Sequence, residues 1–298
     1  MNSSFASALA AAGEAAGAQH YPQGALYMIA TPIGNLADIS LRALHVLHIA
    51  DCVACEDTRH TQTLLRAYGL EKKTIAVHQH NEAEAAVQVV ARLNAGERVA
   101  YASDAGTPAV SDPGARLAAA VREAGLKVVP VPGASSVTAA LSVAGAVDEG
   151  GAFVFAGFLP SKSGEREAVV ATLASEPRVV VLLEAPHRIE ALAKALVPLG
   201  QRRVTLAREL TKQFEQVATT DCQSLSHWLE VDEQRTRGEF VVVLHPQPQA
   251  SSSDEGLRVL RILLAELPVK SAVKLAAEIT GAPRNDLYDA ALKMKGES

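Results

Sequence analysis

Short apolar runs that alternate with Ala- and Leu-rich segments are the feature that most limits how this chain can fold. β-Branched and other apolar residues cluster at 25–30, 52–54, 74–77, 99–102 and 128–131. Between them, segments 40–51, 82–96 and 112–125 carry apolar residues three and four positions apart, which is typical of amphipathic helices. Gly96 and Gly125 follow two of these segments, where a left-handed helix end is expected. The alternation predicts an α/β fold with a mainly parallel sheet covered by helices.

The second half of the chain predicts a second α/β unit and a small helical one. A glycine-rich stretch marks a boundary near residues 133–150, and further strands are expected at 153–156, 179–183, 204–208 and 240–244. The segment "HPQPQASSSDEG" reads as a linker, and helical patterns follow at 256–267, 269–280 and 285–295. Three helices of this size resemble a helix-turn-helix module. We therefore predict domains at 24–133 and 134–245, a linker at 246–256 and a helix-turn-helix-like domain at 257–298.

Composition limits the class of protein. The first 23 residues are rich in Ala and Gly, with neither a basic leader nor an unbroken apolar run, so neither a signal nor a membrane span is expected. We expect a mobile tail, and a docked helix is the alternative. Three cysteines do not build a disulfide framework, which favours a cytoplasmic protein. A net charge of −5 gives no basic footprint, and 4% aromatic residues argue against an extensive base-stacking surface.

The loops that follow the first five predicted strands carry the chemistry. Ligands of open α/β sheets bind beyond the carboxyl ends of the strands. Here those loops are 31–35, 55–60, 78–82, 103–108 and 132–136, and all are rich in polar, Gly or Pro residues. Neither G-x-G-x-x-G nor G-x-x-x-x-G-K-[ST] occurs, so the phosphate cradles of nicotinamide and nucleoside-triphosphate sites are missing. A rigid, backbone-lined pocket with the carboxylate of Asp104 suits a nucleoside–amino-acid conjugate better than a nucleotide.

Several of these loops also allow plainer interpretations. One plainer interpretation is that Ser135 and Ser136 merely cap the helix that follows. The segment "PGASS" is similar to a nucleophile elbow, but it lacks the last glycine of the G-x-S-x-G pattern. Cys52 and Cys55 form a C-x-x-C, but residues three apart in a strand point to opposite faces, so no shared metal ion is expected. The pair of histidines in "HQHNE" could bind metal, although substrate contact or a structural role is favoured. The "EDTR" segment could be an ordinary helix start, with acids at the positive end of the helix.

Taken together, the motifs resemble those of one bacterial family. They are "TPIGNLADIS", "EDTRHT", "HQHNE", "SDAGTPAVSDPG", "VPVPGASS", "FAGFLP", "EAPHRI" and "RELTK", in that order. The chain resembles the 2′-O-ribose rRNA methyltransferases of the tetrapyrrole-methylase-like, class III type, which use S-adenosyl-L-methionine. The resemblance implies two α/β domains with the cofactor in the cleft between them, plus an appended helix-turn-helix domain. It further implies a homodimer and, as substrate, a cytidine in the decoding region of 16S rRNA in the small ribosomal subunit.

The resemblance also assigns residues. The cofactor-binding set is Pro32, Gly34, Asn35, Ser103, Asp104, Ala105, Gly106, Thr107, Pro108, Gly133, Ser135, Ser136 and Gly238. The catalytic set is Glu56, Asp57, Arg59, Arg208 and Glu209. The RNA contacts are His78, His80, Asn81, His187, Arg188 and Lys212. The chain departs from the family pattern at Ala185, where serine is common, and at Gln213-Phe214-Glu215-Gln216, where a His-Glu-Glu run is usual.

Methyl transfer from a sulfonium needs alignment and an acceptor for the hydroxyl proton. Glu56, Asp57 and Glu209 are the candidate bases, and a water molecule is an open alternative. Arginines suit RNA phosphates because their guanidinium groups bind bidentately. A basic RNA face is expected from Arg202, Arg203, Arg208, Lys212, Arg235 and Arg237, with Lys270, Lys274 and Arg284 in the last domain. The alternatives are a tetrapyrrole C-methyltransferase on the same fold and a non-catalytic RNA-binding protein.

Overall fold

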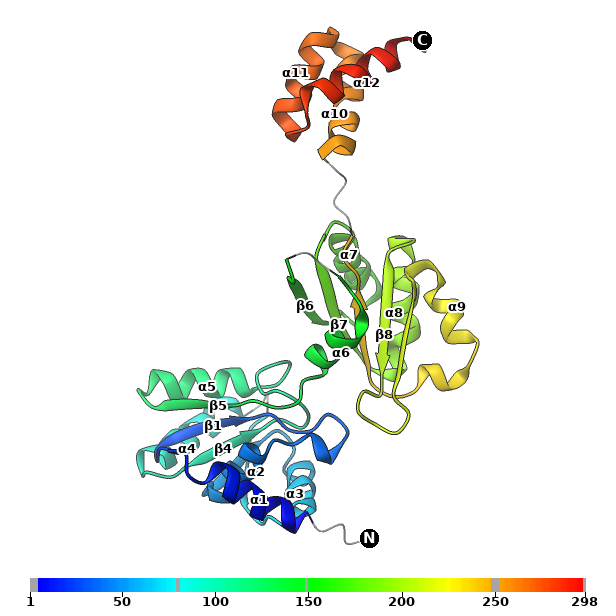
Figure 1. Cartoon of the computed structure of the whole chain (residues 1–298). Helices are drawn as coiled ribbons and strands as arrows, with labels where there is room; N and C mark the ends of the chain where they lie inside the picture. Colours follow the sequence, from blue (N-terminus) through cyan, green and yellow to red (C-terminus); the bar gives the residue numbers. More distant parts are fainter. Residues whose placement is uncertain (1–4, 79–80, 148–149, 248–251, 297–298) are drawn as a thin grey trace.

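A computed structural model describes residues 5–78, 81–147, 150–247 and 252–296 of the chain. Figure 1 shows three units in sequence order: an N-terminal α/β domain, a second α/β domain, and a group of three helices that lies beyond the second domain. Among the described residues, none of the helices is long and apolar enough to span a bilayer.

The first domain is a five-stranded parallel sheet with helices on both faces. Its strand order is β3-β2-β4-β1-β5, and every neighbouring pair is parallel. The strands are β1 Ala25–Ile29, β2 Cys52–Cys55, β3 Lys73–Ala76, β4 Val99–Ala102 and β5 Lys127–Val131. The helices that connect them are α2 Leu41–Ile49, α3 Thr58–Ala67, α4 Glu82–Asn94 and α5 Gly114–Glu123. The predicted parallel sheet is confirmed, as are the left-handed backbones of Gly96 and Gly125 past α4 and α5.

The N-terminal segment differs from its prediction as a mobile tail. Residues Ala6–Ala16 form helix α1, which packs on α2, and Ala12 and Ala16 are buried. The ring of Phe5 meets Tyr68 edge-on with a centroid separation of 5.2 Å, and Tyr21 packs against Tyr27. The prediction was wrong for residues 5–23 because small alanine side chains allow a helix to lie close to α2, which composition does not reveal.

The second domain is a mixed sheet of strand order β6-β7-β10-β8-β9. Only the β6–β7 pair is parallel, and the other three pairs are antiparallel. The strands are β6 Phe153–Phe158, β7 Val179–Glu184, β8 Arg203–Arg208, β9 Gln216–Asp221 and β10 Phe240–Leu244. Helix α6 Ser136–Ala144 covers one face, and the other is covered by α7 Ser163–Leu173, α8 Ile189–Leu196 and α9 Leu225–Glu230.

Strand β10 is the central strand of this sheet, and its five residues are all buried. This burial fits its continuous apolar sequence, FVVVL. Strand β9 was not predicted. It is a polar edge strand that pairs with β8 across the loop 209–215, and its residues are half-buried or exposed. Short 3-10 turns occupy Leu36–Asp38, Pro186–Arg188, Val197–Leu199, Cys222–Ser224 and Glu233–Thr236.

The last unit holds the three predicted helices, α10 Ser252–Glu266, α11 Val269–Thr280 and α12 Arg284–Gly296. Its core is small, and Ala272, Ala276 and Ala291 are fully buried where the helices cross. Gly281 ends α11 in a left-handed conformation, with φ of 72°. Helix α10 begins before residue 257, so the predicted linker is shorter in the structure.

Candidate cofactor and substrate site

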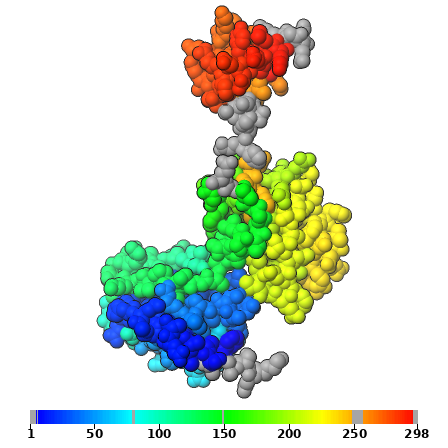
Figure 2. All heavy atoms as spheres, viewed as in Figure 1, coloured from blue at the N-terminus to red at the C-terminus, as the bar shows by residue number. Residues whose placement is uncertain are grey.

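A cavity of about 360 Å³ lies between the two α/β domains. Figure 2 shows these domains meeting along one boundary. From the first domain and α6 the lining residues are Ile33, Glu56, 103–107, 110–112, Ser135 and Ser136. From the second domain they are Phe158, 183–186, Ala207, Leu210 and 239–241. The cavity therefore lies at the carboxyl edge of the parallel sheet, where ligands of open α/β sheets bind.

Backbone hydrogen bonds join the loop after β1 to the loop after β4. Thr31 and Gly106 exchange a pair of N–H···O=C bonds of 3.0 and 3.1 Å. The Thr31 hydroxyl donates to the Ser103 carbonyl at 3.0 Å, and the Ser103 hydroxyl donates to the Gly106 carbonyl at 2.9 Å. The Thr107 hydroxyl donates to the Ala134 carbonyl at 3.0 Å, which ties in the loop after β5. These bonds hold the three predicted cofactor loops together as one rigid wall.

This wall uses backbone conformations that most residues avoid. Gly106 has φ of 80°, while Ala109 and Ser111 have φ of 68° and 75° despite their Cβ atoms. Such strain persists only where surrounding contacts impose it, and it gathers at ligand sites. Gly133 serves a different need, because a Cβ there would lie 3.1 Å from the Cβ of Ala30.

The cavity is acidic. Glu56, Asp104, Asp112, Glu184 and Glu239 line it, and no lysine or arginine is among the described lining residues. Partial burial, together with the charges of Asp104 and Asp112, raises the pKa of the Glu56 carboxyl above its ordinary value, although His78 opposes this. A cavity with this charge favours a cationic ligand over a phosphate.

The carboxylates that come from the second domain already have cationic partners. Arg188 Nε lies 3.0 Å from Glu184 Oε1, so this arginine is tied to the cavity wall. Lys212 Nζ lies 2.9 Å from Glu239 Oε2. Within the part of the chain that is described, Glu56, Asp104 and Asp112 form no ion pair with a lysine or arginine, so the uncompensated negative charge gathers on the first-domain side.

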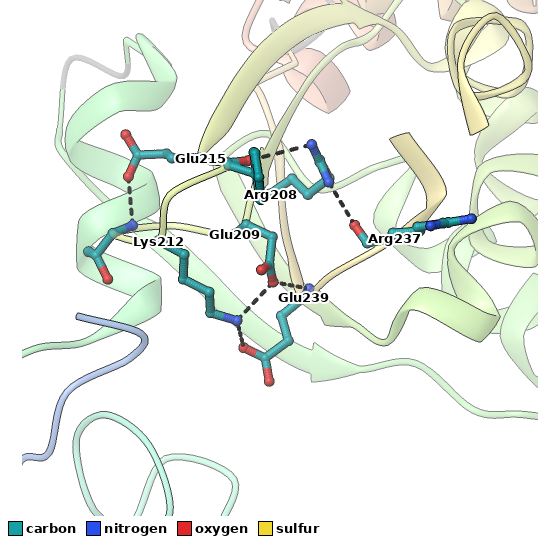
Figure 3. Close-up of polar contacts among 8 residues, drawn as sticks. Arg208, Glu209, Lys212, Glu215, Arg237 and Glu239 are labelled. Carbon is teal, nitrogen blue, oxygen red and sulfur yellow. Dashed lines mark hydrogen bonds and ion pairs between the residues drawn. The ribbon is translucent and has the colours of Figure 1, made fainter. Parts of the chain in front are cut away.

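Loop 209–215 of the second domain carries Lys212, which forms the Lys212 cluster with Glu209 and Glu239 (Figure 3). The ammonium of Lys212 bridges Glu209 Oε1 at 2.8 Å and Glu239 Oε2 at 2.9 Å, and Glu239 N–H donates to Glu209 Oε1 at 2.9 Å. The stem of Lys212 lies against Gly34 of the first domain, where an added Cβ would overlap its Cγ and lie 2.8 Å from its Cε. Gly34 is thus needed for the close approach of the second domain's loop.

Glu209 is held by hydrogen bonds within the second domain. Burial alone would raise its pKa, but the hydrogen bonds from Lys212 and from the Glu239 N–H lower the pKa of Glu209 overall. The φ of Glu209 is 52°, and a Cβ on Gly238 would lie 2.6 Å from the Glu209 carboxyl. Gly238 therefore makes room for Glu209 and does not itself line the cavity.

Arg208 holds loop ends together. Its guanidinium donates to the Arg237 carbonyl at 3.1 Å, to the Phe214 carbonyl at 3.5 Å and to the Gln216 side chain at 3.3 Å. Arg202, which was expected on a basic face, is buried, and its guanidinium donates to three backbone carbonyls. For Arg202 that expectation was wrong, because one planar group satisfies three carbonyls that would otherwise lack partners.

Of the predicted bases, the structure brings Glu56 to the cavity. Asp57 instead caps α3: its carboxylate accepts from the N–H groups of Arg59 and His60 and pairs with the Arg59 side chain at 3.2 Å. These hydrogen bonds, the Arg59 side chain first, lower the pKa of Asp57. Asp57 still reaches the site through its backbone, because its N–H donates to Asp104 Oδ1 at 3.2 Å.

Of the predicted cofactor residues, seven line the cavity directly: Ser103, Asp104, Ala105, Gly106, Thr107, Ser135 and Ser136. Pro32, Gly34, Asn35, Pro108, Gly133 and Gly238 lie beside the lining without forming it. Asn35 accepts a hydrogen bond from Ala37 N–H. Ser135 occupies the position before α6, yet its side chain makes no capping hydrogen bond, so capping does not account for it.

Among the described residues, those predicted to contact RNA do not lie together on one surface of the cavity. Asn81 is structural, since its amide accepts from His78 N–H at 2.8 Å and donates to the Ala76 carbonyl at 3.0 Å. His78 and His187 are exposed, and His80 lies outside the described residues. The lining residues that sequence reasoning missed are mostly apolar ones from the second domain, such as Leu183 and Val241, together with Asp112. Asp112 stands in the quoted "SDPG", but apolar wall residues carry no local signal.

The two cysteines of the C-x-x-C motif lie in the sheet of the first domain. Cys52 and Cys55 are both buried in β2, as their predicted strand requires, and burial raises the pKa of the Cys52 thiol to about 11. Within the described ranges, no group of three His, Cys, Asp or Glu side chains is placed to hold a metal ion.

Comparison with known proteins identifies the family. Residues 25–226 match the model of the tetrapyrrole (corrin/porphyrin) methylases, and residues 250–295 match the RsmI C-terminal HTH domain. The ribosomal RNA small subunit methyltransferase I of Neisseria meningitidis serogroup B is 50% identical over 278 residues, which is 92% of this chain and 95% of the relative. Its namesake from Pseudomonas aeruginosa is 47% identical, over 92% of this chain and 99% of the relative. This chain belongs to the ribosomal RNA small subunit methyltransferase I family.

Solved structures support the fold. A uroporphyrin-III-C-methyltransferase from Thermus thermophilus matches with a TM-score of 0.54 at 23% identity, covering 74% of this chain and 94% of that one. A diphthine synthase matches with a TM-score of 0.58 at 16% identity, covering 74% and 90%. The structure of the Thermus thermophilus enzyme complexed with S-adenyl homocysteine matches with a TM-score of 0.52 at 18% identity. The match covers 73% of this chain and 96% of that one. The predicted tetrapyrrole-methylase fold is confirmed, and the predicted S-adenosylmethionine dependence is confirmed at the level of the family.

Proposed function

We propose that this member of the methyltransferase I family transfers a methyl group from S-adenosyl-L-methionine to the 2′-hydroxyl of a cytidine in the decoding region of 16S rRNA. The observation that carries the proposal is the acidic, backbone-walled cavity between the two α/β domains. The choice of ribose, nucleotide and small-subunit context rests on the motif resemblance. A cytoplasmic homodimer is proposed on the same ground.

The cavity fits the proposed cofactor in volume, wall and charge. Its volume of about 360 Å³ lies in the ordinary range for small-ligand sites. Main-chain groups of 103–107 and the hydroxyls of Ser135 and Ser136 would bind the polar groups of the nucleoside and the amino acid. The carboxylates of Asp104 and Asp112 complement a sulfonium and an ammonium, and no lining lysine or arginine in the described chain opposes them. When bound, S-adenosylmethionine supplies an already activated methyl group.

The chain must then accept the proton of the attacking hydroxyl, and we assign that role to Glu56. Its carboxyl lines the cavity, and its pKa is raised by burial and by its two acidic neighbours. A raised pKa strengthens a carboxylate as a base. Asp57 and Glu209 are weaker choices, because hydrogen bonds that stabilise their charged forms lower the pKa of each.

The test measures methyl transfer to purified small ribosomal subunits, followed by mapping of the modified ribose. Wild-type protein should modify one cytidine, and no methylation of subunits, or methylation of a porphyrinoid instead, would overturn the proposed function.

The variant Glu56→Gln tests the assigned base. It should lower kcat by about 100-fold, the low end for general-base catalysis, while the Kd for S-adenosylhomocysteine changes by less than about threefold. The rise of kcat with pH that ionisation of Glu56 produces should disappear. Glu123→Gln, an exposed glutamate at the end of α5, is the matched control and should behave as wild type. Equal kcat values for the two variants would remove Glu56 from the reaction.

A further inference from the structure

Phe214 is exposed in loop 209–215, and it is not among the residues that line the cavity. Its side chain is 69% exposed, more than any other aromatic side chain among the exposed large hydrophobic residues of the described chain. Aromatic residues make up only 4% of the sequence. An exposed phenylalanine ring on a loop offers a large, rigid apolar surface to a binding partner.

The loop that carries Phe214 is held firmly. Thr211 has φ of 66°, and its N–H donates to the Glu215 carboxylate at 2.6 Å. Within the loop, Lys212 N–H donates to the Glu209 carbonyl and Glu215 N–H donates to the Lys212 carbonyl, at 3.0 and 3.2 Å. The side chain of Lys212 fixes one end of the loop to Glu209 and Glu239 (Figure 3). The ring is therefore presented from an ordered backbone, so little entropy is lost when it binds a partner.

Arg208 places Phe214 beside a second exposed group. The same guanidinium donates to the carbonyls of Phe214 and Arg237, so these two residues are neighbours although they lie far apart in sequence. The side chain of Arg237 is exposed, and Figure 3 shows it pointing away from the Lys212 cluster. Two exposed residues, one aromatic and one cationic, are thus held next to each other through their backbones, and together they form one rim.

The two segments that carry this rim also line the cavity. Leu210, four residues before Phe214, lines the cavity, as does Glu239, two residues after Arg237. A polyanionic RNA cannot be held by the acidic interior, so its neighbouring nucleotides need contacts outside it. An exposed aromatic ring stacks on any base, and an arginine binds phosphate bidentately.

We propose that Phe214 stacks on a base next to the methylated nucleotide while Arg237 binds the adjoining phosphate. This inference rests on the proposed rRNA methylation and names the residues that hold the RNA at the rim. Replacing a stacked aromatic residue by alanine typically weakens binding by about 1–3 kcal/mol, which corresponds to roughly 5- to 150-fold.

The experiment compares Phe214→Ala, Phe214→Tyr and the control Val231→Ala, an exposed apolar residue just after α9 with a 63% exposed side chain. Each variant is assayed for methyl transfer to small subunits, for subunit retention in filter binding without cofactor, and for S-adenosylhomocysteine affinity by calorimetry. Phe214→Ala should raise KM and weaken subunit binding about tenfold, with cofactor affinity unchanged. Phe214→Tyr should restore both within about twofold, because the ring is retained.

Two results would overturn the assignment. Subunit binding by Phe214→Ala equal to that of Val231→Ala would show that the ring does not touch RNA. A change in sedimentation of Phe214→Ala alone, without loss of subunit binding, would assign the ring to a contact between copies of the chain. If wild type binds subunits but transfers no methyl group, the proposed function fails, while the binding comparison still decides the role of Phe214.

Discussion

Lys212 was predicted to contact RNA, but its ammonium is committed to two carboxylates, and this leads to a quantitative prediction. The variant Lys212→Met keeps most of the stem that lies on Gly34 and removes only the charge. The pair with Glu209 is mostly buried, with side-chain exposures of 27% and 20%, whereas Glu239 is 74% exposed. A hydrogen bond between charged groups contributes about 1.5–3 kcal/mol when shielded and about 0–1 kcal/mol at the surface. We therefore expect Lys212→Met to cost about 2 kcal/mol and Glu239→Gln about 0.5 kcal/mol.

The assay uses the single tryptophan of the chain. Trp228 lies in α9, so its fluorescence reports unfolding of the second domain, which contains the Lys212 cluster. A domain-specific probe is needed because a chain of several domains need not unfold in one step. With a urea dependence of about 1.5 kcal/mol/M for a domain of this size, the midpoint for Lys212→Met should fall by about 1.3 M.

The pH dependence gives a second, independent check. The pKa of Glu209 is lowered in the folded protein, so its contribution is present above the unfolded pKa of 4.5 and is lost as pH falls through the folded value. The pKa of Lys212 is raised, so its contribution is present below 10.5 and is lost as pH rises through the folded value. The difference between wild type and Lys212→Met should therefore be constant from about pH 5 to 10 and shrink on the acid side. Equal midpoints for Lys212→Met and Glu239→Gln at pH 7 would refute the reasoning.

Two further predictions concern close packing. Gly34→Ala should weaken the contact between the two α/β domains, because the new Cβ overlaps the Lys212 stem, and calorimetry should show a lower affinity for S-adenosylhomocysteine. This loss of affinity should largely vanish in a Lys212→Ala background. If the loss persists there, the clash lies elsewhere. Cys52 and Cys222 are fully buried with pKa values raised by burial to about 11, so a disulfide reagent at pH 8 should modify them only after urea unfolding. Rapid labelling of the native protein would contradict this burial.

Local sequence patterns determined a large part of the fold. All nine predicted strands exist, with ends within about two residues, because each is a short apolar run bounded by turn-forming residues. The loops after β1, β4 and β5 meet as predicted, since parallel strands place their carboxyl ends at one edge. The motif resemblance predicted the family and its cofactor, because each of these cofactor loops consists of residues that are contiguous in the sequence.

The tertiary structure decided what depends on residues far apart in the chain. Glu56 and Asp57 are adjacent and chemically alike, yet one faces Asp104 and Asp112 in the cavity while the other caps α3. The pairing of Lys212 with Glu239, the burial of Arg202, the docking of α1 and the edge strand β9 likewise have no local signature. The physical reason is that a side chain's charge state and partners are set by distance and burial in space. The sequence by itself determined the backbone wall of the site, and only the folded arrangement decided which carboxylate stays uncompensated inside it.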